Sequence, residues 1–342
     1  PKDYIRLRLT GDKATDAADA SGTLLFDVRN RKWSDEMLEE FQIEKSLMPR
    51  VYESIEVTGS VSRSASEATG LKTGTAIIAG AGDNAAGAVG MGVTRPGTVS
   101  VTIGTSGVVF GVTEQPKLDL KGRIHTLCHA IPGRWHNTGV TLAAGLSLKW
   151  FRQNLAEGKS FNDLDDEAAA IQAGSDGALW LPYLMGERTP HLDPQARAAF
   201  VGLTASHTRP HLTRAIMEGV AFSLRDSLEI FKETGAEVSS IRLGGGGATS
   251  HIWRAIQASV YGRSVEILEA DQGAAFGAAI LAGVGAGAWN SVDEACERSI
   301  RVAETVEPDA ESIGILDRAY EAYKMLYSAL APAMKTIAKA NA

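Results

Sequence analysis

The sequence has 342 residues, of which 44% are hydrophobic and 22% are charged, a profile typical of a globular protein with room for two domains. Its formal net charge of -7 argues against a protein that binds nucleic acid through a broadly basic surface. No run of 18 apolar residues predicts a membrane span, and the Ala/Gly-rich residues 273–288 predict close helix packing instead. Two cysteines are too few for a disulfide framework, so we expect a reducing, cytoplasmic location.

The first part of the chain, residues 1–78, mixes short helical signals with turns. Ser34 before two acidic residues predicts a short helix with a serine N-cap, and residues 75–79 predict a buried strand. The chain opens on Pro1 with no secretory signal, and its first residues are typical of the interior of a domain. We therefore expect that further residues precede Pro1 in the natural protein.

Beyond this part, strand-like runs that end in glycine alternate with amphipathic helices. The strands are predicted over residues 98–103 and 240–243, and the helices over residues 211–232, 252–261 and 312–337. Such alternation predicts an α/β fold.

One glycine-rich turn carries a carboxylate. Asp83 follows Gly80 and Gly82 and precedes a small-residue helix. Glycines let a substrate approach the backbone, and a carboxylate there could accept a proton from a hydroxyl group during phosphoryl transfer. The alternative is that Asp83 is simply a helix N-cap, which the local pattern alone favours.

Two further glycine turns could hold a nucleotide. The turn at residues 104–107, Gly-Thr-Ser-Gly, could wrap a phosphate with N–H and hydroxyl donors, or could be an ordinary β-hairpin loop. It matches neither the P-loop nor the dinucleotide-binding pattern. The run of four glycines at residues 244–247 leaves no Cβ, so a flat base or ribose could lie on the backbone there. Its alternative is a flexible turn.

Other polar residues give weaker signals. Gly145 at a helix start, with Lys149 one turn on, could line a nucleotide pocket, or the helix could simply pack with Trp150 in the core. The charges of Glu187 and Arg188 are typical of a solvated loop. The seven histidines show no metal-ligand spacing, so we expect no metal site in the protein itself.

Taken in order, these motifs resemble the FGGY family of carbohydrate kinases over nearly the whole chain, and within it the xylulokinases most. The matching segments are residues 16–27 with Trp33 and Ser34, residues 80–84, residues 104–107, and residues 245–250 with Trp253 and Arg254. The resemblance implies an α/β actin-like ATPase (ribonuclease H-like) fold, with the second lobe complete and the first partial. It implies three parts: residues 1–78 as the remainder of a sugar-binding lobe, residues 79–308 as the nucleotide-binding lobe, and residues 309–342 as a C-terminal helix. This helix could pack on the second lobe or reach back to the first, and we expect the latter because a long terminal helix needs an apolar partner.

The resemblance also implies roles for single residues. Asp83 matches the catalytic general base, and Asn84 lies beside it in the sugar site. The residues implied for ATP binding are Gly104, Thr105, Ser106, Gly145, Lys149, Gly246, Gly247, Ala248 and Ser250, with His251 as an alternative to Ser250 beside the adenine. Mg²⁺ is expected to arrive with ATP, held by phosphates and water.

The implied reaction is ATP-dependent phosphorylation of D-xylulose to D-xylulose 5-phosphate. The family's first phosphate loop is absent from this sequence, so we expect this chain alone to be inactive or nearly so. The alternatives are a kinase for glycerol, gluconate or rhamnulose, or a non-catalytic ATP-sensing actin-like module. The expected partners are a sugar and ATP, without nucleic acid or membrane, and a homodimer is left open.

Overall fold

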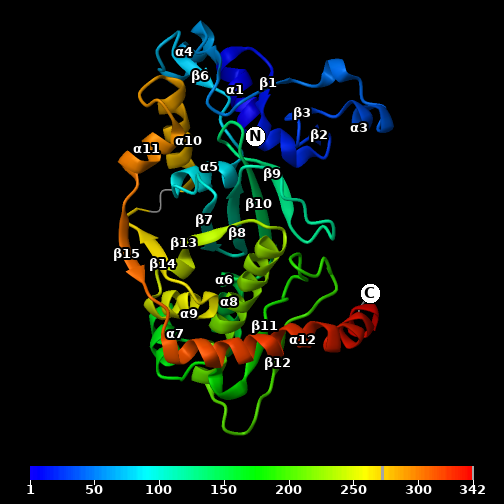
Figure 1. Cartoon of the computed structure of the whole chain (residues 1–342), viewed down its shortest axis with the longest axis vertical. Coiled ribbons are helices and arrows are strands. Elements are labelled where there is room, and N and C mark those ends of the chain that lie inside the picture. Colours follow the sequence, from blue (N-terminus) through cyan, green and yellow to red (C-terminus); the bar gives the residue numbers. More distant parts are fainter. Residues whose placement is uncertain (271–272, 341–342) are drawn as a thin grey trace.

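The computed structural model describes residues 1–270 and 273–340, and a seven-stranded mixed sheet lies at its centre (Figure 1). The strand order is β15-β14-β13-β7-β8-β10-β9. The bounds are β7 (Gly97–Ile103), β8 (Gly107–Thr113), β9 (His125–Cys128), β10 (Trp135–Thr141), β13 (Val238–Gly245), β14 (Val265–Leu268) and β15 (Val302–Val306). β13 runs parallel to β7 and β14, and the remaining neighbours are antiparallel.

Both faces of this sheet are covered. Along β7, Val99, Val101 and Ile103 project into one apolar cluster, since alternate residues of a strand face the same side. On β8, Phe110 and Val112 belong to a second cluster on the other side. The sheet therefore separates two helical layers, as expected for the predicted α/β fold.

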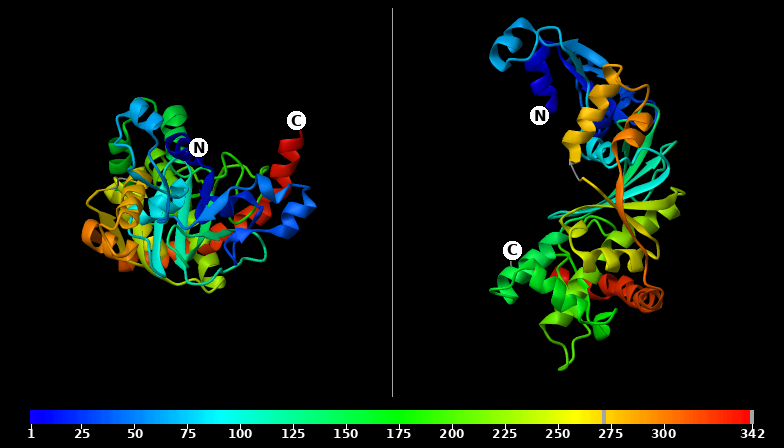
Figure 2. Two further views of the ribbon diagram at one scale, coloured as in Figure 1. Left: turned by 90° about the horizontal axis from the view of Figure 1, so that it is seen from above. Right: turned by 90° about the vertical axis from the view of Figure 1, so that its left-hand side faces the viewer.

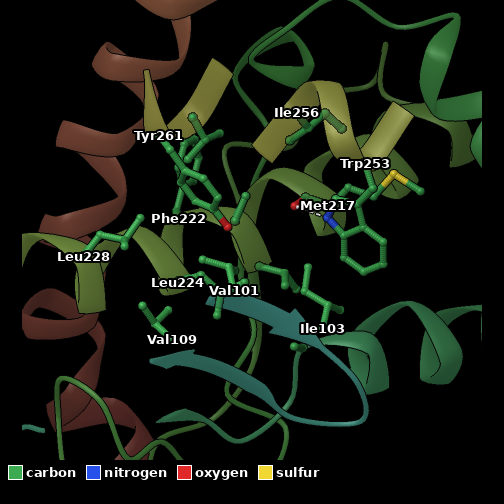
Figure 3. Packing of buried hydrophobic residues seen from close by; sticks show 14 of the residues in the cluster. Val101, Ile103, Val109, Met217, Phe222, Leu224, Leu228, Trp253, Ile256 and Tyr261 are labelled. Atoms are coloured by element: carbon green, nitrogen blue, oxygen red, sulfur yellow. Dashed lines mark hydrogen bonds between the residues drawn. The ribbon is translucent and has the colours of Figure 1, made fainter. Parts of the chain in front are cut away.

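The first layer consists of the long helix α8 and its neighbours. The bounds are α6 (Gly145–Leu155), α7 (Phe161–Ala169), α8 (Arg209–Glu233) and α9 (His251–Tyr261). Figure 3 shows α8 and α9 packed over β7 and β8, with the Trp253 Nε1–H donating to the Met217 carbonyl at 3.0 Å. The predicted helices over residues 211–232 and 252–261 are confirmed.

The second layer is built from small residues. Its bounds are α5 (Asp83–Gly90), α10 (Gly273–Gly285) and α11 (Val292–Ser299). A Cβ on Gly277 would lie 1.7 Å from the Ala86 carbonyl oxygen, so α5 and α10 approach each other more closely than any larger side chain allows. This confirms the predicted close packing in the Ala/Gly-rich stretch. Within residues 1–270 and 273–340, no helix is long and apolar enough to cross a membrane.

Short elements make up the first part of the chain. Their bounds are α1 (Lys2–Thr10), β1 (Ala14–Asp16), α2 (Ala17–Ala20), β2 (Phe26–Asp27), β3 (Lys32–Trp33), α3 (Asp35–Glu40), β4 (Arg50–Tyr52), β5 (Val57–Ser60), α4 (Arg63–Thr69) and β6 (Ala76–Ile78). Ser34 caps α3, as predicted, because its Oγ accepts from the Met37 N–H at 3.2 Å. The predicted strand at residues 75–79 is confirmed as β6, but it is not buried, because it forms a two-stranded sheet with β5 and stays partly exposed.

The C-terminal helix α12 (Ala310–Ala340) packs on the same side of the sheet as α8 and α9. Its buried residues Leu316, Tyr320 and Tyr323 join the cluster of α8 and α9, beside the small sheet of β11 (Leu179–Leu181) and β12 (Ala199–Val201). In Figures 1 and 2 it lies at the opposite end of the molecule from α1. The prediction that this helix packs back on the first lobe is therefore wrong, because α8, α9 and β11 already cover its apolar face.

Candidate nucleotide and catalytic site

A cavity of about 320 Å³ opens where β7 ends and where α6, α7 and α9 begin. Seven of the predicted nucleotide residues line it: Gly104, Thr105, Gly145, Lys149, Gly246, Gly247 and Ser250. They come from three separate parts of the sequence, and the sheet brings them together. Ser106 and Ala248 were predicted with them but do not line this cavity, since Ser106 closes the β7–β8 hairpin and the side chain of Ala248 is buried.

The Gly104 turn is held on the first turn of α6. The Gly104 N–H donates to the Ser106 carbonyl at 2.9 Å and closes the hairpin. The Gly104 carbonyl accepts from the Gly145 N–H at 2.9 Å, and the Thr105 carbonyl accepts from the Leu146 N–H at 3.1 Å. A Cβ on Gly145 would lie 2.4 Å from the Gly104 oxygen, so only glycine permits this contact. Residues 104–107 thus form a β-hairpin loop, as one of the two alternatives predicted. The loop places a polar turn, held by α6, at one end of the cavity.

Glu187 is hydrogen-bonded to the segment that leads from β10 to α6. The prediction of a solvated loop is wrong for this residue. It is only 2% exposed and accepts hydrogen bonds from the Thr141 hydroxyl at 2.5 Å, the Leu142 N–H at 3.0 Å and the Arg188 N–H at 2.7 Å. Burial raises its pKa to about 7, against the lowering effect of these three donors. Glu187 therefore fixes the segment that connects β10 to α6.

The glycine run after β13 forms the opposite wall. Gly246 is exposed, and a Cβ there would have only the Ile103 carbonyl oxygen nearby, at 3.8 Å. Gly247 is buried, and a Cβ there would lie 2.6 Å from the Ile103 Cβ. Ser250 then caps α9 by accepting from the Trp253 N–H at 3.2 Å, whereas His251, the alternative to Ser250, does not line the cavity.

Sequence reasoning missed one wall of the cavity. Phe161, Asn162 and Asp165 line it from the first turns of α7. The only local signal was the capping box of Ser160 and Asp163, which predicts where a helix begins but not what it faces.

Asp83 is the first residue of α5, and Gly82 occupies the N-cap position. The alternative that Asp83 is an N-cap is therefore wrong. Its exposed carboxylate accepts from the Asn84 N–H at 2.9 Å. Asp83 and Asn84 together line a smaller cavity of about 160 Å³ with Ser100 and Thr102 of β7.

The two cavities lie on opposite faces of the sheet, near the end of β7. Thr102 lines the Asp83 cavity, whereas the next residue, Ile103, lines the nucleotide cavity. Successive strand residues face opposite sides, so the two cavities approach the Gly104 turn from either side of β7.

Acidic residues of the first part of the chain lie beside Asp83. A Cβ on Gly82 would lie 3.1 Å from the Asp19 carboxylate. Lys2 forms an ion pair with buried Asp16 at 2.6 Å and lies 3.6 Å from Asp19. The sequence segment around these residues carried the family resemblance, but no role had been assigned to either aspartate.

The larger cavity has polar groups in its lining and holds no cluster of metal ligands among the described residues. In residues 1–270 and 273–340 no group of three or more His, Cys, Asp or Glu side chains could hold a metal ion. Backbone N–H groups, hydroxyl groups and Lys149 surround the cavity instead. This donor set suits an anionic ligand that brings its own Mg²⁺.

Comparison with known proteins finds carbohydrate kinases that match both parts of the chain. The profile of the FGGY family of carbohydrate kinases, C-terminal domain, matches residues 99–286, and that of the N-terminal domain matches residues 1–90. A xylulose kinase of Bacillus subtilis is 40% identical over 328 residues, which cover 96% of this chain and 66% of that protein. The chain thus spans just under two thirds of the length of that relative.

Solved structures agree with the fold. The crystal structure of a xyloylose kinase from Brucella ovis has a TM-score of 0.91 at 36% identity, covering 97% of this chain and 68% of the other. A gluconate kinase from Lactobacillus acidophilus has a TM-score of 0.93 at 27% identity, covering 98% and 68%. The predicted actin-like ATPase fold is confirmed, and the chain belongs to the FGGY family of carbohydrate kinases.

Proposed function

We propose that this chain carries the nucleotide site and the general base of a kinase that converts D-xylulose and ATP to D-xylulose 5-phosphate and ADP. The observation that supports this most is that two cavities lie on opposite faces of β7 near its end, one lined by Asp83 and the other by the Gly104 turn. Phosphoryl transfer depends mainly on positioning the two substrates and stabilising charge, and this arrangement suits an in-line transfer across the turn.

In the proposed reaction, the Asp83 carboxylate accepts the proton of the sugar's C5 hydroxyl. The hydroxyl oxygen bonds to the γ-phosphorus, the bond from that phosphorus to the β–γ bridging oxygen breaks, and ADP leaves. Asn84 would contact the sugar beside Asp83. A carboxylate at this position would act as the general base that takes up the proton as the new oxygen–phosphorus bond forms.

The nucleotide roles follow the lining of the larger cavity. Gly104 and Thr105 would contact the β- and γ-phosphates, Gly145 and Lys149 the middle of the nucleotide, and Gly246, Gly247 and Ser250 the adenosine. Ser106 and Ala248 would act only by shaping their loops. Mg²⁺ would supply charge neutralisation on the phosphates when the nucleotide is bound.

Because the chain spans just under two thirds of the first relative's length, we expect it to have little or no activity alone. We propose that residues 1–78 and 79–308 act as parts of two lobes around the substrate. A cytoplasmic location and a homodimer stay predictions.

Sugar-dependent ADP production tests the proposal. The assay uses a form of the protein extended to the length of its relatives, with D-xylulose, gluconate, glycerol and L-rhamnulose as substrates. We expect the highest kcat/KM with D-xylulose. A preference for gluconate would favour the alternative suggested by the Lactobacillus gluconate kinase. ATP binding without turnover of any sugar would favour a non-catalytic ATP-sensing module.

A further inference from the structure

The wall of the nucleotide cavity that α7 forms has no role in the proposed function. Phe161 and Asp165 lie four residues apart on α7, so their side chains share one face of the helix, and both line the cavity. Phe161 is 42% exposed, which is high for a phenylalanine, and the Arg152 guanidinium lies 4.4 Å from its ring centroid. An aromatic surface left open in a cavity suits a flat ligand ring.

Asp165 faces the glycine wall across this cavity. Asp165 and Ser250, the N-cap of α9, both line the cavity, and burial raises the pKa of the Asp165 carboxyl against the lowering effect of the Ser250 hydroxyl. The Ser250 Oγ already accepts from the Trp253 N–H, so its hydroxyl hydrogen is the one available to Asp165. The carboxylate has a second oxygen, and an ionised carboxylate can only accept hydrogen bonds.

The position of this pair in the cavity indicates which part of a nucleotide it meets. The polar Gly104 turn lies at the start of α6, and Lys149 lies one helical turn further on. α7 follows α6 in the chain and adds the apolar ring to the lining. When the phosphates of a nucleotide bind at the Gly104 turn, its base lies at the α7 wall. A base ring packed against Phe161 then presents its edge to Asp165.

We infer that Asp165 selects adenine by accepting a hydrogen bond from its exocyclic amino group, while Phe161 supports the face of the ring. This inference rests on the proposed function, since it concerns the base bound in the same cavity. Guanine and hypoxanthine carry a carbonyl oxygen where adenine carries the amino group. That oxygen would oppose the carboxylate with no hydrogen between them, and an unpaired polar group in a partly buried site is costly.

The test compares equilibrium binding of Mg-ATP, Mg-ITP and Mg-2′-deoxyATP to the 342-residue chain by calorimetry. ITP differs from ATP at the relevant position by carrying oxygen in place of the amino group. We expect the wild-type chain to bind ATP at least about tenfold more tightly than ITP, a ratio that corresponds to one hydrogen bond to a charged group. Equal affinities would overturn the inference without touching the proposed function, whereas failure to bind any nucleotide would count against the proposed function itself.

Asp165→Asn should reduce the ATP-to-ITP ratio to near one, because a carboxamide can donate to the ITP oxygen as well as accept. Asp166→Asn is the matched control, since Asp166 is exposed on the same helix and does not line the cavity. It should keep the wild-type ratio. An ATP-to-ITP ratio that Asp165→Asn leaves unchanged would overturn the inference. A variant that loses affinity for ATP but not for 2′-deoxyATP would also overturn it, because that result would assign Asp165 to the ribose. If Asp165→Asn does not fold, the wild-type ratio alone still decides.

Discussion

Asp83 is an exposed carboxylate on the first turn of α5, where it accepts from the Asn84 N–H and does not occupy the N-cap position. We expect Asp83→Ala to lower kcat for D-xylulose by about 10²–10⁴-fold, the usual contribution of a general base, while leaving ATP affinity nearly unchanged. The measurement is steady-state kinetics on an active form of the protein, with nucleotide binding by calorimetry. Asp166→Ala is the control, and turnover retained after Asp83→Ala would remove Asp83 from the reaction.

The two glycines of the adenosine wall should respond differently to the same substitution. Gly246→Val adds a side chain where the only neighbour is 3.8 Å away, so it should weaken ATP binding at least about tenfold with little loss of stability. Gly247→Val drives its Cβ into Ile103 and should lower the melting temperature by several degrees. Calorimetry and thermal unfolding separate the two effects. Tight ATP binding by a folded Gly246→Val variant would be inconsistent with this wall.

For single residues, the sequence predicted most of the residues that line the larger cavity but not all of them. Glycines after strands were informative because only glycine allows the Gly145 and Gly247 contacts. Ser106 and Ala248 were assigned along with their neighbours, although adjacency in the chain does not say which way a side chain points. Asp165 carried no local pattern, because its position depends on how α7 packs.

Among the secondary-structure elements, α8 and α12 are joined by a buried carboxyl. The Tyr320 hydroxyl donates to Asp226 at 2.6 Å, and burial raises the Asp226 pKa to about 7. Arg225, Glu229 and Lys324 are the charged groups around it. The pKa in the unfolded chain is about 3.9, so the folded state holds this proton more tightly. The resulting stability is present in full at low pH and is lost as pH rises from about 4 to about 7.

Asp226→Asn removes this titration while keeping an acceptor for Tyr320. Between pH 5 and pH 8, the free energy of unfolding of the variant should therefore improve relative to wild type by about 1–3 kcal/mol. Urea unfolding at the two pH values measures the difference, with Asp166→Asn as the exposed control. A difference that does not change with pH would mean that Asp226 is already ionised in the fold at pH 5.

The elements also show where sequence patterns stop being informative. The period of apolar residues predicted α8, α9 and α12 correctly as helices, since an amphipathic stripe is a local property. The partner of α12 was predicted wrongly, because the stripe does not say which apolar surface it will cover. The environment of Glu187 was predicted wrongly for the same reason, since two of its three donors, Thr141 and Leu142, lie 46 and 45 positions away in the chain.

For the whole molecule, the sheet order is what creates the site. β7 lies between β13 and β8, so the glycine run after β13 and the turn after β7 end side by side. The helices of the two layers then place the Asp83 cavity on one face and the nucleotide cavity on the other. The family resemblance supplied this architecture, whereas strand order could not be read from periodicity alone.

The central claim is that this chain forms a nucleotide site, and a calorimetric titration of Mg-ATP into the 342-residue chain tests it most directly. D-xylulose is titrated afterwards, and Gly246→Val serves as the control. The account predicts saturable one-to-one binding of ATP to wild type and weaker binding to the variant, with xylulose binding weak or absent in a chain that spans just under two thirds of the first relative's length. A folded wild-type chain that binds no ATP would contradict the assignment of the cavity.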